Sequence, residues 1–194
     1  FLDGLEDAYE EGRAMGTFAQ ETANEYQLTR EEMDDYSIES LRRANAAIES
    51  GAFDGEVVPV TIVTRKGETT VEHDEAPGKG NPDKIPQLRP AFAKDGTITA
   101  ATSSSISDGA AAVVLSRESV AKENGQTPVA KIVGLAAHAQ EPSKFTVAPI
   151  GAIEKLLEQT GWSAEDVDLW EVNEAFACVA MFAMRDIGIP HDKI

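Results

Sequence analysis

Strand-like and helix-like segments alternate along the last third of the chain, and this alternation most limits the folds that it can adopt. Residues 129–137 and 167–172 are rich in β-branched and apolar side chains, which is typical of buried strands. Between them, a helical run has Pro149 at its start and Gly161 at its end, and a second, largely apolar helical run reaches Ile187. This order predicts an α/β fold with a mostly parallel, layered sheet and helices on its faces.

A polar dipeptide, Asn173-Glu174, lies where the second strand-like segment gives way to the apolar helical run. A strand-to-helix junction gathers free backbone N–H groups and the positive end of a helix dipole. A polar side chain there can therefore hold a water or a developing anion. The alternative is that Asn173 only caps the helix.

The N-terminal part of the chain predicts two helices. Residues 17–26 place apolar side chains at helical spacing. Thr29 and Glu32 form the T-x-x-E pattern of a capping box ahead of a second amphipathic helix, which Gly51 ends.

The middle of the chain predicts strands and one long loop. Residues 57–64 and 69–73 are expected to pair as a hairpin. Residues 75–90 hold four prolines and two glycines, which favours a long functional loop. Residues 97–101 and 110–115 predict two more strands, separated by a serine-rich turn.

Composition limits the partners of this chain. Its 194 residues carry a formal net charge of −17, which argues against nucleic acid or an anionic membrane as a partner. No apolar run approaches the ~20 residues that span a bilayer. The acidic residues 1–11 are unlike a secretory or transit peptide, so we expect a cytoplasmic protein.

The side chains most often used for metal binding and nucleophilic catalysis are scarce. The single cysteine, Cys178, excludes an internal disulfide and a cysteine-based metal cluster. It lies in the apolar helical run, which predicts a buried, inert thiol. His73, His138 and His191 are expected to have surface or structural roles, and we predict no metal site.

Three motifs, in order along the chain, carry a resemblance to a known family. The first begins with Met15-Gly16, the second is GTITAATSSSISDGAAA at residues 96–112, and the third is EVNEAFA at residues 171–177. Together they resemble the thiolases, which carry a G-T-[VI]-T-A segment running into D-G-A-A-A, and then N-E-A-F-A at about this separation. The resemblance extends over residues 5–194.

The resemblance also implies residues that this chain does not contain. Thiolases place a nucleophilic cysteine well before the Met-Gly segment. After N-E-A-F-A they have a Gly-His-Pro segment and a second catalytic cysteine in a Cys-x-Gly turn. None of the three occurs in these 194 residues. We therefore expect the chain to be the central part of a thiolase and to be inactive alone.

The fold implied by the resemblance is a thiolase-like layered α-β-α-β-α arrangement, incomplete here, with an inserted α+β loop domain. Residues 1–90 would form that loop domain, which in the family covers coenzyme A and helps to assemble oligomers. Residues 91–127 would end the N-terminal half of the fold, and residues 128–194 would begin the C-terminal half. The full-length enzyme is expected to be a homodimer or homotetramer.

The family's catalytic roles transfer to two residues of this chain. Asn173 matches the asparagine that holds a water which, with the Gly-His-Pro histidine, forms an oxyanion hole for the enolate of a thioester. Glu174 would support and orient it.

Several residues match positions along coenzyme A and the acyl group. Ser104 matches a serine that hydrogen-bonds the pantetheine arm, and Phe92 and Ala100 match positions packed along the same arm. Leu5 and Met15 match positions around the acyl pocket. For Ser104, a turn that satisfies its own backbone is the alternative.

Three further binding residues are predicted. Phe145 matches the residue that contacts the acyl chain in short-chain thiolases, where a bulky ring would limit chain length. Phe176 would line the pocket, with plain core as the alternative. Lys84 belongs to residues 65–94, a slightly basic segment that would supply cations for the phosphates of coenzyme A. Scattered loop charges are the alternative there.

The function implied by the resemblance is acyl transfer between acetyl-CoA molecules, giving acetoacetyl-CoA, or the reverse thiolysis. The coenzyme A thioester is the substrate, and no cofactor is expected. Two alternatives stay open: a degradative 3-ketoacyl-CoA thiolase of broader chain length, and a non-catalytic coenzyme A- or lipid-binding module with the same fold.

Overall fold

The computed structural model describes residues 4–107 and 110–194. Asp108 and Gly109, which belong to the second motif, lie outside the described residues. The elements, in chain order, are α1 (Met15–Glu25), α2 (Arg30–Glu49), β1 (Val60–Thr64), β2 (Gly67–Val71), α3 (Glu75–Lys79), η1 (Pro82–Gln87), α4 (Glu118–Glu123), η2 (Pro142–Val147), α5 (Ala148–Thr160), η3 (Ala164–Asp166), α6 (Ala177–Ile187) and η4 (His191–Lys193). Within these residues, no helix combines the length and apolar character needed to cross a bilayer.

The two predicted N-terminal helices are present as α1 and α2. The capping box at the start of α2 is complete, because the Glu32 backbone N–H donates to Thr29 Oγ1 at 3.2 Å and the Thr29 N–H donates to Glu32 Oε2 at 2.7 Å. Two of the donors that a helix start leaves free are thus satisfied. The sequence prediction for this helix start is confirmed.

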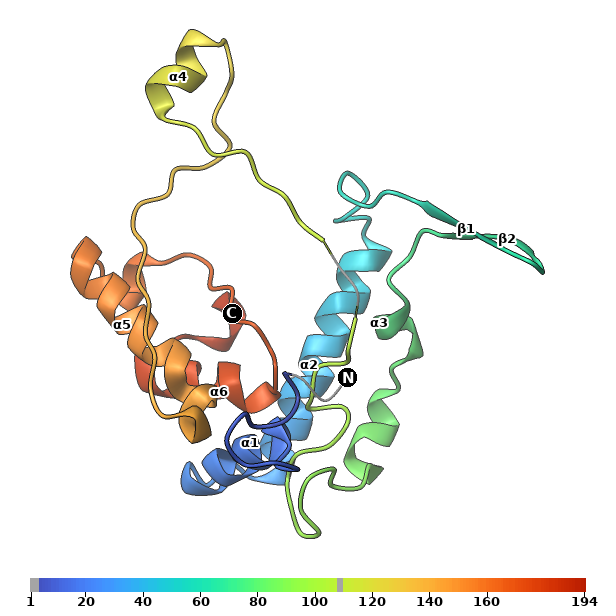
Figure 1. Cartoon of the computed structure of the whole chain (residues 1–194). Coiled ribbons are helices and arrows are strands. Elements are labelled where there is room, and N and C mark those ends of the chain that lie inside the picture. Colours follow the sequence, from blue (N-terminus) through green and yellow to red (C-terminus); the bar gives the residue numbers. More distant parts are fainter. Residues whose placement is uncertain (1–3, 108–109) are drawn as a thin grey trace.

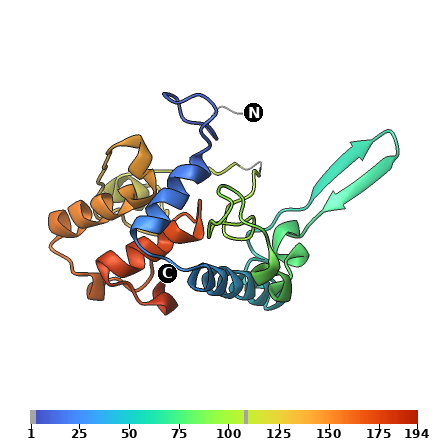
Figure 2. The same ribbon diagram turned by 90° about the horizontal axis from the view of Figure 1, so that it is seen from below.

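The predicted hairpin is also present, with a shorter first strand and a second strand that begins two residues earlier than predicted. β1 and β2 pair antiparallel from Val60 opposite Val71 to Thr64 opposite Gly67. The hairpin projects from the rest of the molecule (Figures 1 and 2), and its apolar side chains, including those of Val60, Ile62 and Val63, are exposed.

The prediction of one long loop over residues 75–90 was wrong, because two short helices form there. Asp74 caps α3 through the Ala76 N–H, and Asn81 caps η1 through the Asp83 N–H. Pro82 begins η1, where a missing N–H costs nothing. Arg30 of α2 then donates to the carbonyls at both Ile85 and Leu88 at 3.0 Å, which holds η1 against α2.

The predicted strands over residues 110–115 and 129–137 are not formed among the described residues, where β1 and β2 make the only sheet. Both segments run through a wide excursion that carries α4 (Figure 1). Their apolar side chains are exposed, Val114 to 96% and Leu135 to 78%. A strand needs a hydrogen-bonded neighbour, and an apolar pattern in one segment does not supply it.

The predicted strands over residues 97–101 and 167–172 are likewise absent, because their backbones bond elsewhere. The Ile98 N–H donates to Gln20 Oε1 at 3.0 Å, and the Thr99 N–H donates to Thr102 Oγ1 at 2.9 Å. The Trp170 N–H donates to the carbonyl of Lys193 at 2.8 Å. Side-chain and loop partners thus replace the ladder that a parallel sheet would provide.

The core surrounds α6, which lies beside α5 and α1 (Figures 1 and 2). Its residues Cys178 and Phe182 are fully buried, and Phe182 packs on Tyr26 with 4.3 Å between the ring centroids. α5 fills the predicted helix, carrying Pro149 in its first turn and ending at Gly161 in the left-handed region. The predicted helices α1, α2, α5 and α6 are therefore confirmed.

Thr29→Ala removes the cap at the start of α2 while leaving the packed face of the helix unchanged. We expect the free energy of unfolding of the full-length protein to fall by about 1 kcal/mol, as for a lost N-cap. Urea unfolding measures the change. Thr127→Ala, in an exposed loop, is the control and should change stability by less than about 0.5 kcal/mol. Equal effects for the two variants would contradict the capping role.

Candidate functional site

The Asn173-Glu174 turn leads into α6 without capping it. The N-cap of α6 is Phe176, in extended conformation and without a side-chain cap bond. The first helical N–H, that of Ala177, donates instead to the carbonyl of Thr102 at 2.9 Å. The capping alternative for Asn173 is therefore wrong, because the helix starts too far along the chain for its side chain to serve as the cap.

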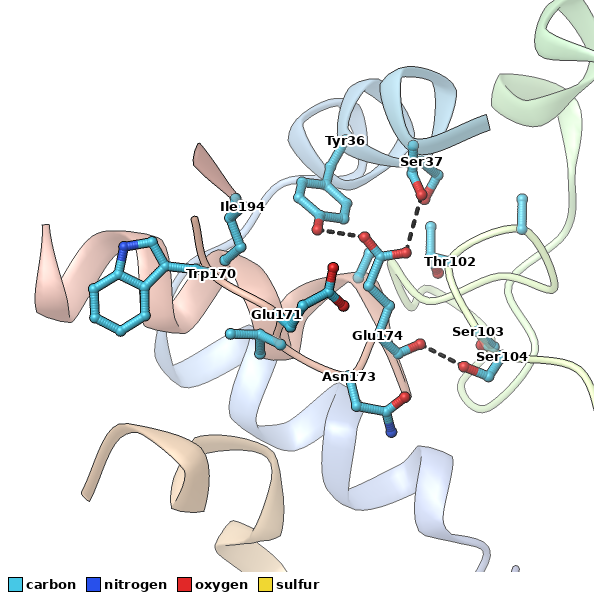
Figure 3. A pocket seen from close by; sticks show the side chains of 14 residues that line it. Tyr36, Ser37, Thr102, Ser103, Ser104, Trp170, Glu171, Asn173, Glu174 and Ile194 are labelled. Carbon is cyan, nitrogen blue, oxygen red and sulfur yellow. Dashed lines mark hydrogen bonds between the residues drawn. The ribbon is translucent and has the colours of Figure 1, made fainter. Parts of the chain in front are cut away.

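The serine-rich segment lies along this turn and holds its backbone. The Ser104 N–H donates to the carbonyl of Ala175 at 3.0 Å, and Ser103 forms an isolated antiparallel bridge with Phe176. The Ser104 hydroxyl donates to the carbonyl of Glu174 (Figure 3). The second and third motifs, far apart in sequence, thus form one unit.

The carboxylate of Glu174 is bound by two hydroxyls of α2. Tyr36 Oη donates to Oε1 at 2.6 Å (Figure 3). Ser40 Oγ donates to Oε2 at 2.9 Å. Tyr36 and Ser40 are four residues apart and so lie on one face of the helix. Burial, and then the hydrogen bond to Glu174, raise the pKa of Tyr36, so the phenol stays protonated and remains a donor near neutral pH.

The Asn173 side chain is left free by these contacts. It is exposed, and no partner within the described residues bonds its amide. Figure 3 shows the amide pointing away from the Glu174 carboxylate. The Asn173 carbonyl accepts from the Ala175 N–H at 3.0 Å, which fixes the turn. A fixed backbone with a free amide can present both a donor and an acceptor to a water or ligand.

Two cavities meet at Asn173. One, of about 470 Å³, is lined by Tyr36, Ser40, Ser104, Trp170 and Glu174, among others. The other, of about 360 Å³, is mostly apolar and lies between Phe145 and the side chains of α5 and α6. Asn173 lines both, together with Glu171 and Val172.

Three of the predicted binding residues form an aromatic cluster beside the turn. Phe176 lies edge-on to Phe92 with 6.0 Å between ring centroids, and it is tilted against Phe145 at 6.3 Å. Phe145 lines the apolar cavity, whereas Phe176 is part of the core and lines neither cavity. The placement of Phe176 fits the plain-core alternative.

The other predicted binding residues are spread more widely. Met15 donates its backbone N–H to the carbonyl of Leu5 at 2.9 Å, so these two are neighbours at the start of α1. Ala100 is exposed in the turn before the serine-rich segment, and Lys84 is exposed on η1. None of these four lines either cavity.

Gly16, Tyr36 and Ser40 are structural contributors that the sequence reasoning missed. A Cβ at Gly16 would lie 2.2 Å from Phe92 Cζ, so only glycine lets this ring pack against α1. A glycine inside a helix was the available signal. No sequence signal marked Tyr36 and Ser40, because 138 and 134 residues separate them from Glu174.

Cys178 is a free, buried thiol, as predicted. Burial raises its pKa to about 12, so almost no thiolate exists near neutral pH. Among residues 4–107 and 110–194, no three His, Cys, Asp or Glu side chains are grouped so as to hold a metal ion. His191 stacks on Tyr36 with 5.2 Å between ring centroids, and His73 is exposed.

Two family descriptions match consecutive parts of the chain. Residues 1–119 match "Thiolase, N-terminal domain", and residues 126–194 match "Thiolase, C-terminal domain". The chain belongs to the thiolase family. The predicted division at residues 90 and 127 stays a prediction.

Curated relatives and solved thiolase structures match nearly all of the chain. It is 45% identical to an acetyl-CoA acetyltransferase of Yarrowia lipolytica, over 99% of this chain and 48% of that protein. It superposes on the Bacillus anthracis acetyl-CoA acetyltransferase with a TM-score of 0.91 at 40% identity, over 97% of this chain and 48% of that one. For the Ascaris suum Acat5 thiolase, solved in complex with coenzyme A, the TM-score is 0.90 at 42% identity, over 98% of this chain and 49% of that one.

The chain therefore spans about half the length of the relatives that it matches. The superpositions confirm the thiolase-like α/β fold predicted from the motifs. The superpositions cover nearly all of this chain. The superposed residues therefore include most of the extended segments that have no partner strand in this structure. Two relatives from Gibberella zeae, 43% and 42% identical over 99% of this chain, are named as cytosolic and mitochondrial respectively; the chain covers 48% and 45% of them.

The buried thiol of this thiolase chain gives a direct test of the core around α6. With iodoacetamide at pH 8, Cys178 of the full-length protein should stay unmodified, because it is buried and its pKa is about 12. The same thiol should react fully in denaturant, which serves as the control. Peptide mass spectrometry measures both, and labelling of the native protein at the rate of an exposed thiol would contradict the structure.

Proposed function

We propose that this chain forms the central part of an enzyme that transfers an acyl group between two acetyl-CoA molecules, giving acetoacetyl-CoA, or runs the reverse thiolysis. The observation that carries the proposal is the Asn173 amide, which is free and lies where two cavities meet. Its turn is held through the backbone by the serine-rich segment and through the Glu174 side chain by α2. Such a preorganised donor suits charge that develops on a thioester oxygen.

In this mechanism Asn173 holds a water that donates a hydrogen bond to the thioester oxygen while the α-carbon loses its proton. The negative charge of the enolate then forms next to a donor that is already in place. Glu174 supports Asn173 from the opposite side of the turn. Cys178 is buried and protonated and does not serve as the nucleophile. As the resemblance to thiolases implies, the nucleophile and the proton-transfer groups would come from parts of the enzyme other than these 194 residues.

The proposed substrate is a coenzyme A thioester, and no further cofactor is required. Phe145 lines the apolar cavity and offers a surface for the acyl group, and the half-buried ring of Phe92 offers one for the pantetheine arm. Phe176 packs against both rings from the core. Ser104 keeps hydroxyl lone pairs after donating to Glu174 and can accept from the arm. Lys84 is exposed and can meet the phosphates. The solved Ascaris suum relative, in complex with coenzyme A, supports this ligand class.

A homodimer or homotetramer is the proposed assembly of the full-length enzyme. The support is the hairpin β1–β2, which projects from the body (Figure 2). It exposes apolar side chains, including those of Val60, Ile62 and Val63. Exposed apolar patches on a projecting element commonly mark protein contacts. Sedimentation of the full-length protein distinguishes these states from a monomer.

We propose a cytoplasmic location, which cell fractionation tests.

Two alternatives make different predictions. A degradative 3-ketoacyl-CoA thiolase would accept longer acyl chains, and the size of the Phe145 ring beside the apolar cavity argues against this. A non-catalytic binding module would not need Asn173, whereas here its turn is held by bonds from α2 and from the serine-rich segment.

Asn173→Ala in the full-length enzyme should lower kcat by roughly 10²-fold or more, as the loss of an oxyanion donor does. KM should change little, because the contact forms mainly in the transition state. Steady-state thiolysis of acetoacetyl-CoA measures both. Asn124→Ala, after the exposed helix α4, is the control. An unchanged kcat would remove Asn173 from the mechanism and favour the binding module.

Phe145→Ala should broaden the range of acyl chains. We expect kcat/KM for 3-ketohexanoyl-CoA, relative to acetoacetyl-CoA, to rise about tenfold, the scale of adding room for two methylenes. Phe53→Ala, at an exposed ring, is the control and should leave the ratio unchanged. If the unmodified enzyme already cleaves both substrates equally well, the degradative alternative takes the place of the acetyl-specific one.

A further inference from the structure

The Glu174 carboxylate joins the turn that carries Asn173 to a helix from the other end of the chain. Its two oxygens accept from Tyr36 and Ser40 of α2, at 2.6 Å and 2.9 Å. Figure 3 shows the carboxylate directed at α2, while the Asn173 amide points the opposite way. Glu174 is therefore turned away from the group that we propose to face the substrate.

The two donors are themselves held in place. Tyr36 is 6% exposed, and its ring is stacked on His191 at an interplanar angle of 15°. Arg43, farther along α2, donates to the carbonyls of His191 at 2.8 Å and Ile194 at 2.7 Å. These contacts fix α2 against the C-terminal segment, so the hydroxyls of Tyr36 and Ser40 form a rigid base.

On its other face, the turn is held through its backbone by the serine-rich segment. The Ser104 hydroxyl and N–H donate to the carbonyls of Glu174 and Ala175, which sets the path of the chain. The bonds from α2 instead hold the Glu174 side chain. Hydrogen bonds to a charged carboxylate are stronger than neutral ones, so the bonds from α2 are the contacts best able to set the tilt of the turn.

We propose that Tyr36 and Ser40 are positioning residues, which direct the Asn173 amide by holding the Glu174 carboxylate. The inference rests on the proposed function only for the catalytic role of Asn173. The claim that Tyr36 and Ser40 hold the turn rests on the hydrogen bonds, and it can be tested without measuring catalysis.

The kinetic test uses the full-length enzyme with Tyr36→Phe, which removes one hydroxyl and keeps the ring. We expect kcat for acetoacetyl-CoA thiolysis to fall about tenfold with KM little changed, because small displacements of a catalytic group lower the rate steeply. Ser40→Ala should act in the same direction and, as a smaller change, keeps the test available if Tyr36→Phe does not fold. Adding Tyr36→Phe to Glu174→Ala should cause no further loss.

Tyr26→Phe is the matched control. Tyr26 Oη also donates to a carboxylate, that of Asp186, at 2.8 Å, but at the far end of α6. The Tyr26→Phe variant should leave kcat unchanged, and its effect on stability should add to that of Glu174→Ala. If Tyr26→Phe lowered kcat as much as Tyr36→Phe, or if the effects of Tyr36→Phe and Glu174→Ala were additive, Tyr36 would not act through Glu174 and the proposal would be overturned.

Amide hydrogen exchange separates this inference from the proposed function. In Tyr36→Phe, the amides of Ala175 and Ala177 should exchange at least about tenfold faster, while Tyr26→Phe leaves them unchanged. If the unmodified protein showed no thiolysis, the proposed function would fail, and faster exchange would still support the positioning contacts. Unchanged exchange at both amides would overturn the positioning role, whatever the activity.

Discussion

The burial of α6 is the constraint on which the rest of this structure depends. Side chains from α1, α5 and the segment before α5 pack against Cys178 and Phe182, and Tyr36 of α2 packs near Ala180. Each fully buried large apolar side chain contributes about 1.5–3 kcal/mol, so this helix organises the elements around it. Since the turn with Asn173 leads directly into α6, the packing that stabilises the fold also places the site.

The extended segments on either side of α4 show the opposite situation. Their β-branched side chains have the composition of buried strands, yet they are exposed and unpaired among the described residues. The thiolase structures that superpose on this chain are about twice as long. Exposed strand edges and apolar patches are prone to association. These segments are thus the part of the molecule least satisfied by its own contacts.

The residues that meet at the candidate site were predictable in part. The N-E-A-F-A motif pointed to Asn173, and the serine-rich motif pointed to Ser104, whose backbone and hydroxyl do bond to the turn. Tyr36 and Ser40 gave no signal, because a tyrosine and a serine on an amphipathic helix are ordinary residues until the fold brings them to Glu174. The helix-capping alternative for Asn173 failed for a related reason, since the start of α6 is set by its bond to Thr102.

The sequence by itself determined the helices α1, α2, α5 and α6, the capping box of α2, the hairpin, the buried cysteine and membership of the thiolase family. Those features depend on interactions within a few residues or on motifs in a set order. Only the tertiary structure decided which carboxylate oxygens meet which hydroxyls, which way Asn173 faces, and which strand-like segments find a partner. The physical reason is that such contacts join residues more than 100 positions apart, and their geometry depends on packing that no local pattern records.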